Sequence, residues 1–358
     1  MLRRPMTRLA VAAAGTICAF GAAAASAAPT TGWSGHNLVP GAITSDTATI
    51  SSITFPGALG QGTIVAWRQL VTPGHIFFKV KFPGHRWGAK QELPGITAVT
   101  ATPPVFRSYR APNGHNAILA VWTGRLDHHI WYEQGQTRAN GTINWNNATV
   151  LPNHVLYTNT TNAPAVLFTN HAGVVIFSWR GPANHVRFAI GKPIGRGFVW
   201  SNSAIVPGAP VTPTCTGAPC TGSTPALAEV QDTSSTGTVY FIWRQLGTNN
   251  VLYSTVGDPV FRTSPPVFTG PTTDTGVLTD VAPAAADDTF SGFGPLLLVF
   301  KQVGQTSVFY QTLTGTTWSA PTQLTATATN VAPALFVNRL ATTTPGADGN
   351  ILLQGYSN

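Results

Sequence analysis

A short motif centred on a large aromatic residue recurs along this chain and limits the folds open to it. The five copies read IVAWRQL, LAVWTGR, IFSWRGP, YFIWRQL and LLVFKQV, with their aromatic residues at Trp67, Trp122, Trp179, Trp243 and Phe300. The intervals between these residues are 55, 57, 64 and 57 positions. Periods of this length are typical of repeat architectures, in which each repeat buries its apolar face against its neighbours.

Each period contains the sequence of four short strands. A proline-led strand comes before each of the last four anchors and again after Phe300, reading PPVF, APAVLF, TPALAEV, APAAAD and APALFVN. The strand after each anchor reads HIFFKVKF, HIWYEQG, HVRFAIG, NVLYSTV and SVFYQTL. A fourth strand carries a second aromatic residue, Trp87, Trp145, Trp200 or Trp318, and is degenerate in one copy. Four strands per period, separated by Gly and Pro, predict the blade of a β-propeller.

The two ends of the repeat region complement each other. The segment around Trp33, TGWSGHNLVPG, is expected to be a fourth strand with no strands before it. APALFVN and NILLQGY, near the other end, are expected to be first and second strands, and no third strand is identified. Joining the two ends leaves no unpaired sheet edge. We therefore expect an all-β chain: a β-propeller of six blades of about four antiparallel strands, one of them a composite blade closed by the N- and C-terminal strands. Five or seven blades are the less favoured counts.

The first 28 residues have the pattern of an export signal. Arg3, Arg4 and Arg8 precede an apolar run that ends in Ala25-Ser26-Ala27. This pattern predicts a secretory signal peptide at residues 1–28, a single propeller domain at residues 29–358 and a secreted, extracellular protein. A disulfide between Cys215 and Cys220 is the natural expectation in an exported chain. A metal or redox pair is the alternative, but no further Cys or matching His pair completes a zinc site.

Composition argues against several classes of function. Only 9% of the residues are charged, and the Lys and Arg residues behind the net charge of +8 are scattered. We therefore expect no nucleic-acid partner and, because no later segment is a transmembrane candidate, no membrane insertion. No cofactor or metal motif is found, so neither is expected. Glycoside hydrolysis needs two carboxylates that face one bond, and no such pair stands out among Glu92, Glu133 and Glu229.

Two polar positions recur next to the anchors. One directly follows the anchor and carries Arg or Lys in four of the five copies; the other opens the third strand and carries His in three copies. Cationic and amide donors beside aromatic rings suit sugar hydroxyls, whereas pairing with neighbouring carbonyls or carboxylates is the structural alternative. The candidate ligand-binding residues are Arg68, His75, His129, Trp131, Arg180, His185, Arg244 and Asn250. No residue is predicted to be catalytic.

The repeat from Trp33 to Tyr356 resembles the propellers of the sialidase superfamily and the bacterial and fungal propeller lectins. The Asp-box turn of sialidases is incomplete: TLTGTTW keeps Gly315 and Trp318 but has Leu313 where the aspartate belongs. The resemblance implies a sugar ligand. We therefore expect a secreted, non-catalytic, lectin-like propeller whose partner is a glycan or a cell-surface polysaccharide. A divergent sialidase-like glycoside hydrolase and a non-catalytic protein-interaction propeller are the alternatives.

Overall fold

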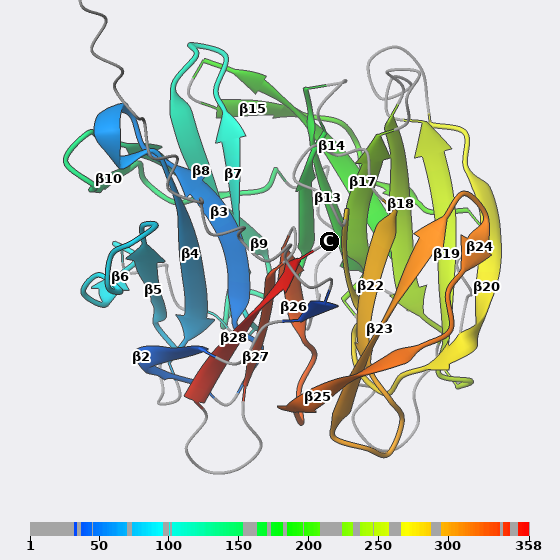
Figure 1. The fold of residues 1–358 in the computed structure, drawn as a ribbon. Helices are drawn as coiled ribbons and strands as arrows, with labels where there is room; N and C mark the ends of the chain where they lie inside the picture. The colour runs from blue at the N-terminus through cyan, green and yellow to red at the C-terminus, as the bar shows by residue number, and fades with distance from the viewer. Residues whose placement is uncertain are drawn as a thin grey trace, which may run out of the picture.

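The structure, a computed structural model, describes most of the chain between residues 32 and 357 (Figure 1). Positions 34–36, 45, 70–73, 96–99, 101, 153–162, 170–172, 182–184, 196, 208–223, 232–236, 246, 258–265, 288–294, 337–338 and 344–349 lie outside the described residues. The predicted signal peptide and both cysteines of the predicted disulfide, Cys215 and Cys220, also lie outside them, and both remain predictions. The described part is all β apart from one 3-10 turn, η1 (Gly57–Leu59).

The described strands form six antiparallel sheets. The first sheet contains β3 (Thr49–Thr54), β4 (Gln61–Arg68), β5 (Ile76–Lys81) and β6 (Gln91–Glu92). The second contains β7 (Val105–Arg110), β8 (Asn116–Thr123), β9 (Ile130–Thr137), β10 (Ile143–Trp145) and β11 (Thr149–Val150). The third contains β12 (Ala165–Phe168), β13 (Val175–Arg180), β14 (Val186–Ile194), β15 (Gly197–Trp200) and β16 (Ala204–Ile205).

The remaining three sheets follow the same plan. The fourth contains β17 (Ala226–Gln231), β18 (Gly237–Arg244), β19 (Asn250–Gly257) and β20 (Thr269–Leu278). The fifth contains β21 (Ala284–Asp287), β22 (Leu296–Lys301), β23 (Ser307–Thr314), β24 (Thr317–Trp318) and β25 (Thr322–Ala328). The sixth joins β26 (Ala334–Phe336), β27 (Arg339–Thr343) and β28 (Asn350–Ser357) to β1 (Gly32–Trp33) and β2 (Asn37–Ile43). The predicted β-propeller is confirmed.

The recurring aromatic residues occupy the second strand of a sheet, as the sequence pattern predicts. Their side chains are at most 2% exposed, and most of each second strand is buried with them. Both faces of these strands are covered because neighbouring sheets pack face to face. For example, Leu119 and Val121 of β8 pack toward the third sheet, whereas Ile118 and Ala120 pack toward the first. Such strands read as continuous apolar runs, which is the pattern of a strand buried on both sides.

The sixth sheet corrects one expectation. NILLQGY, expected as the second strand with no third strand after it, lies in β28 and is the third strand; β27 is the second. β28 pairs with β27 on one side and with β1 and β2 on the other, where Trp33 is opposite Tyr356 and Leu38 is opposite Leu352. The sequence pattern missed β27 because its residues, RLATT, include no anchor aromatic.

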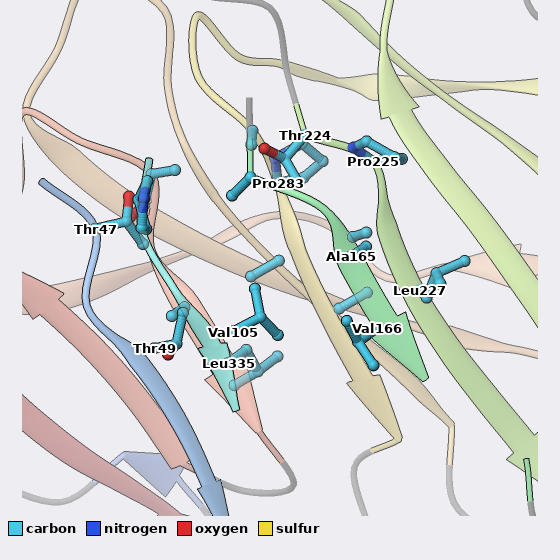
Figure 2. A pocket seen from close by; sticks show the side chains of 18 of the residues that line it. Thr47, Thr49, Val105, Ala165, Val166, Thr224, Pro225, Leu227, Pro283 and Leu335 are labelled. Carbon is cyan, nitrogen blue, oxygen red and sulfur yellow. The ribbon is translucent and has the colours of Figure 1, made fainter. Parts of the chain in front are cut away.

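The innermost strands meet around a common centre. β3 contacts β7, and the contacts continue through β12, β17, β21 and β26 back to β3. The starts of these six strands and the turns before them surround a cavity of about 690 Å³ that includes open solvent (Figure 2). Its lining is mostly Ala, Pro, Thr and Val, as at Thr47, Thr224 and Pro283. Small side chains are needed there because six chain segments converge on one axis.

A threonine turn leads into several innermost strands, a feature that the sequence reading missed. The hydroxyls of Thr100, Thr279 and Thr329 donate to the carbonyl oxygens two residues ahead, over 2.7, 3.1 and 3.0 Å. Each threonine is fully buried. These bonds satisfy backbone acceptors where the chain turns into the centre, and such local bonds favour a turn over continued strand.

Among the described residues, no helix has the length and apolar character needed to cross a membrane.

Candidate functional site

The predicted polar positions do form a repeated local structure. In five sheets the turn between the second and third strands is closed by the same backbone bond, in which the residue after the cationic position donates to the His, Asn or Ser carbonyl. Gln69 N bonds to His75 O at 2.8 Å, Gly181 N to His185 O at 2.9 Å, and Gln245 N to Asn250 O at 2.7 Å. The positions that align in the sequence repeat therefore occupy equivalent places in the five sheets.

At least three of the four cationic side chains at the position after the anchor bond to an aspartate of the same chain. Arg68 Nη2 lies 3.0 Å from Asp46 Oδ2, and Arg244 Nη1 donates to the carbonyl oxygen of Asp280 over 2.6 Å. Lys301, the equivalent residue of the fifth sheet, lies 2.6 Å from the Asp280 carboxylate and is only 6% exposed. Burial raises the pKa of Asp46, and the charge of Arg68 partly opposes that rise. These cations connect the end of a second strand to the turn that enters an innermost strand.

Two of the three histidine positions are also paired within the chain, whereas the buried Nδ1 of His185 has no hydrogen-bond partner among the described residues. His75 Nδ1 lies 2.8 Å from Glu92 Oε1. His129 Nδ1 lies 3.6 Å from Asp127 Oδ2, which also accepts a 2.9 Å hydrogen bond from Trp131 Nε1. Burial lowers the pKa of Arg180 and of Arg244, and the charge of Arg244 lowers that of Arg180 further. The structure thus gives structural contacts to the side chains of at least five of the eight predicted residues, Arg68, His75, His129, Trp131 and Arg244.

Replacing Lys301 with Met should show how much this structural role contributes. The variant keeps most of the side-chain volume but removes the ammonium group that bonds to Asp280 and to the Gln305 carbonyl at 2.7 Å. We expect a loss of about 2 kcal/mol in the free energy of unfolding, because a partly buried carboxylate loses the cation that contacts it and keeps only the more distant charge of Arg244. Urea denaturation of the variant and the wild type measures this difference in the free energy of unfolding.

Arg68→Met is the matched comparison. The Arg68–Asp46 pair is more exposed, at 28% and 26% of the side chains, so its loss should cost about 1 kcal/mol or less. A larger loss for Arg68→Met than for Lys301→Met would contradict this ordering.

A different part of the second sheet forms an open polar groove. Tyr109 of β7 is opposite Ala117 of β8, Ala117 is opposite Gln136 of β9, and Gln136 is opposite Asn144 of β10. Residues directly opposite in a sheet share a face, so these four side chains form a row across the sheet. Gln134 of β9 and Asn146, which directly follows β10, extend the row, because Asn146 N bonds to Gln134 O.

This face turns toward the third sheet. Closer to the middle of the sheet it is apolar and packed, but at the Gln136 end the packing gives way to a groove of about 500 Å³ that includes open solvent. Gly195, between β14 and β15, contributes to the far wall. The lining residues with polar side chains are Tyr109, Asn113, His115, Gln134, Gln136, Arg138, Asn144 and Asn146.

The aromatic side of the groove is held rigidly. The Tyr109 ring stacks on Phe168 with a centroid distance of 4.4 Å and an angle of 1°, and it lies 5.9 Å from the Phe198 ring. Burial raises the pKa of Tyr109, so its hydroxyl stays protonated. Gln134 is only 8% exposed, whereas Asn144 and Asn146 are exposed. The groove therefore offers amide donors and acceptors at several depths beside a fixed ring.

None of the eight predicted ligand-binding residues lines this groove or the central cavity. The sequence does hold a signal for the groove: Gln and Asn alternate with other residues in EQGQ and INWNN, two segments of one period. Arg107, the charged residue of the central cavity, bonds to the carbonyls of Ile50 and Val166 over 3.2 and 3.1 Å. Burial lowers its pKa to about 10.

The described part of the chain contains no candidate metal site. No group of three or more His, Cys, Asp or Glu side chains is arranged there to hold an ion. The lining of the groove, as far as the described residues define it, includes neither Asp nor Glu. The groove can bind a ligand through hydrogen bonds, through stacking on an aromatic ring and through the positive charge of Arg138.

The fold belongs to the β-propeller class. No model of a protein family matches the chain, and no curated protein sequence matches it either. Among solved structures, AofleA from Arthrobotrys oligospora aligns with a TM-score of 0.54 and 11% identity over 89% of this chain and 81% of that chain. The Aleuria aurantia lectin in complex with alpha-methyl-L-fucoside gives 0.53 and 10% over 87% and 93%. A Penicillium chrysogenum alpha-L-arabinanase complexed with arabinobiose gives 0.51 and 12% over 87% and 92%. At these identities the likeness is one of fold, and the expected resemblance to propeller lectins is confirmed at that level.

Proposed function

We propose that this protein is a secreted, non-catalytic propeller that binds carbohydrate through the groove of the second sheet. The observation that carries the proposal is the row of amide side chains beside the fixed Tyr109 ring. Each Asn or Gln amide offers two donor hydrogens and an acceptor oxygen, which matches the paired donor and acceptor character of sugar hydroxyls. An aromatic ring completes such a site by covering the apolar face of a pyranose.

Binding explains this groove better than hydrolysis does. A glycosidase needs two carboxylates facing one bond, and the nearest carboxylates of the second sheet do not reach the groove. Asp127 lies at the opposite end of β9, and Glu133 is 1% exposed and lies opposite Ala120, on the face that packs toward the first sheet. Structures of similar fold are named as complexes with alpha-methyl-L-fucoside and with arabinobiose, which supports sugar as the ligand class.

A glycan array followed by calorimetry tests the proposal. We expect the full-length mature protein to bind a subset of glycans, and Gln136→Ala with Asn144→Ala to abolish that binding while leaving the melting temperature within a few degrees. Asn147→Ala is the matched control, because Asn147 is an exposed amide next to the row but outside the groove lining. Binding that survives the double substitution would remove the groove from the proposal.

The alternative function is that of a divergent glycoside hydrolase, which the likeness in fold to an arabinanase favours. A panel of chromogenic glycosides separates the two functions. Release of the chromophore above the rate of a heat-denatured control would establish an enzyme. A blank glycan array together with an inactive panel would instead favour a protein-interaction propeller.

We further propose that the molecule is a six-bladed ring whose last blade is completed by strands from both ends of the chain. Six sheets among the described residues, and the cycle of contacts between their innermost strands, support this count. The predicted export signal at residues 1–28 and the predicted Cys215–Cys220 disulfide belong to the same proposal of a secreted protein.

A further inference from the structure

Positive charge gathers around the proposed groove. Arg138 and His115 contribute to its lining, and both are exposed. No ion pair joins Arg138 to another described residue. Arg110, at the end of β7, follows the groove residue Tyr109 and donates from Nε to the carbonyl oxygen of Gly114 over 3.4 Å. A ligand in the groove would therefore meet at least one guanidinium group on its open side.

The two sheets that flank the groove are unusually poor in acidic residues. Between Leu93 and Ala228 the sequence has eight Lys or Arg residues and only two acidic ones, Asp127 and Glu133. Asp127 lies at the far end of β9 and bonds to Trp131. Glu133 is buried on the other face of the sheet, and burial raises its pKa to about 8. Neither carboxylate offsets the charge of Arg138 at the groove.

We propose that the groove selects glycans that carry an anionic group, a carboxylate or a sulfate, over neutral glycans of the same backbone. The inference rests on the proposed carbohydrate-binding function and adds the ligand class. In this arrangement the amide row binds hydroxyl groups and Arg138 binds the anionic group. A guanidinium donates two parallel hydrogen bonds to a carboxylate or sulfate, a match that neutral hydroxyls do not provide.

The test compares ligands that differ only in charge. Calorimetry of the full-length mature protein with tetragalacturonate and with its fully methyl-esterified form isolates the carboxylate. Lactose 3′-sulfate and lactose do the same for sulfate. We expect the anionic member of at least one pair to bind about tenfold or more tightly, since hydrogen bonds to charged groups are the stronger ones. Its affinity should fall as salt is raised, whereas that of the uncharged member should not.

Two variants locate the charge. Arg138→Gln removes the charge but keeps hydrogen-bonding groups, and should reduce the preference for the anionic ligand to less than about twofold. Arg86→Gln is the control and should keep the preference, because Arg86 is an exposed arginine in the connection between β5 and β6 and is not part of the groove lining.

The outcomes separate this inference from the proposed function. Equal affinity for both members of each pair, or binding only to neutral glycans on the array, would overturn the anionic selection and leave carbohydrate binding intact. A blank array would overturn both. Binding of poly(U) RNA in preference to every glycan would also overturn the inference, because the groove would then be selecting phosphate.

Discussion

Removal of residues 350–358 is expected to leave a chain that does not fold into a soluble protein. These residues include β28, which hydrogen-bonds to β27 on one side and to β1 and β2 on the other. The deletion removes the fully buried Ile351 and the bond from Thr327 to Gln354, and it exposes the edges of three strands. Burial of one such apolar side chain contributes about 1.5–3 kcal/mol, and free strand edges promote aggregation.

The soluble fraction after expression and a thermal melt measure this effect. The control is removal of Asn358 alone, which lies after the end of β28 and should change little. If the protein lacking residues 350–358 melts within a degree or two of the full-length chain, the proposal that both ends complete one blade is wrong.

Replacing Glu133 with Gln should stabilise the protein near neutral pH by about 3 kcal/mol. Glu133 is 1% exposed, its Oε2 lacks a hydrogen-bond partner in the structure, and burial raises its pKa from 4.5 to about 8. The folded state therefore favours the protonated carboxyl. Glutamine is close in shape to that protonated form and carries no charge at any pH.

The sign of the pH dependence follows from the raised pKa. The wild-type protein has the full contribution of the neutral carboxyl below pH 4.5 and loses it as the pH rises toward about 8, where the unfolded state gains more by ionising. Urea denaturation at pH 4.5 and pH 7 should show the two proteins nearly equal at the lower pH and separated at the higher one.

Glu92→Gln is the control for the Glu133 experiment. Its carboxyl is half exposed beside His75, so the change should shift stability by about 1 kcal/mol or less at either pH. A Glu133→Gln variant that tracks the wild type at both pH values would show that the carboxyl is not desolvated.

The sequence predicted those parts of the fold that show as a residue pattern within a single strand. Trp67, Trp122 and Trp179 align because each anchor lies in a strand that is buried on both faces, and this leaves a continuous apolar run. β27 was missed because it has no apolar pattern of its own. It is a strand because it pairs with β28.

The alternation of Gln and Asn in EQGQ and INWNN did not by itself reveal the groove, for a related reason. Tyr109, Gln136 and Asn144 come from three strands, and only the pairing registers place them in one row. Likewise, nothing in the order of residues joins Arg68 to Asp46, which come from either side of the first hairpin. The repeated cations were correctly identified as a set, but their partners depend on the three-dimensional fold.

The sixth sheet also sets the order in which the molecule can be assembled. β1 and β2 have their partner in β28, whose residues are synthesised more than three hundred positions after Trp33. The other sheets contain only consecutive strands, so each can form as soon as its own segment has been made. Closing so long a loop is slow and costs chain entropy that local hairpins do not. We therefore expect the first strands of the chain to remain without a partner while the other five sheets form, and their pairing with β28 to come late in folding.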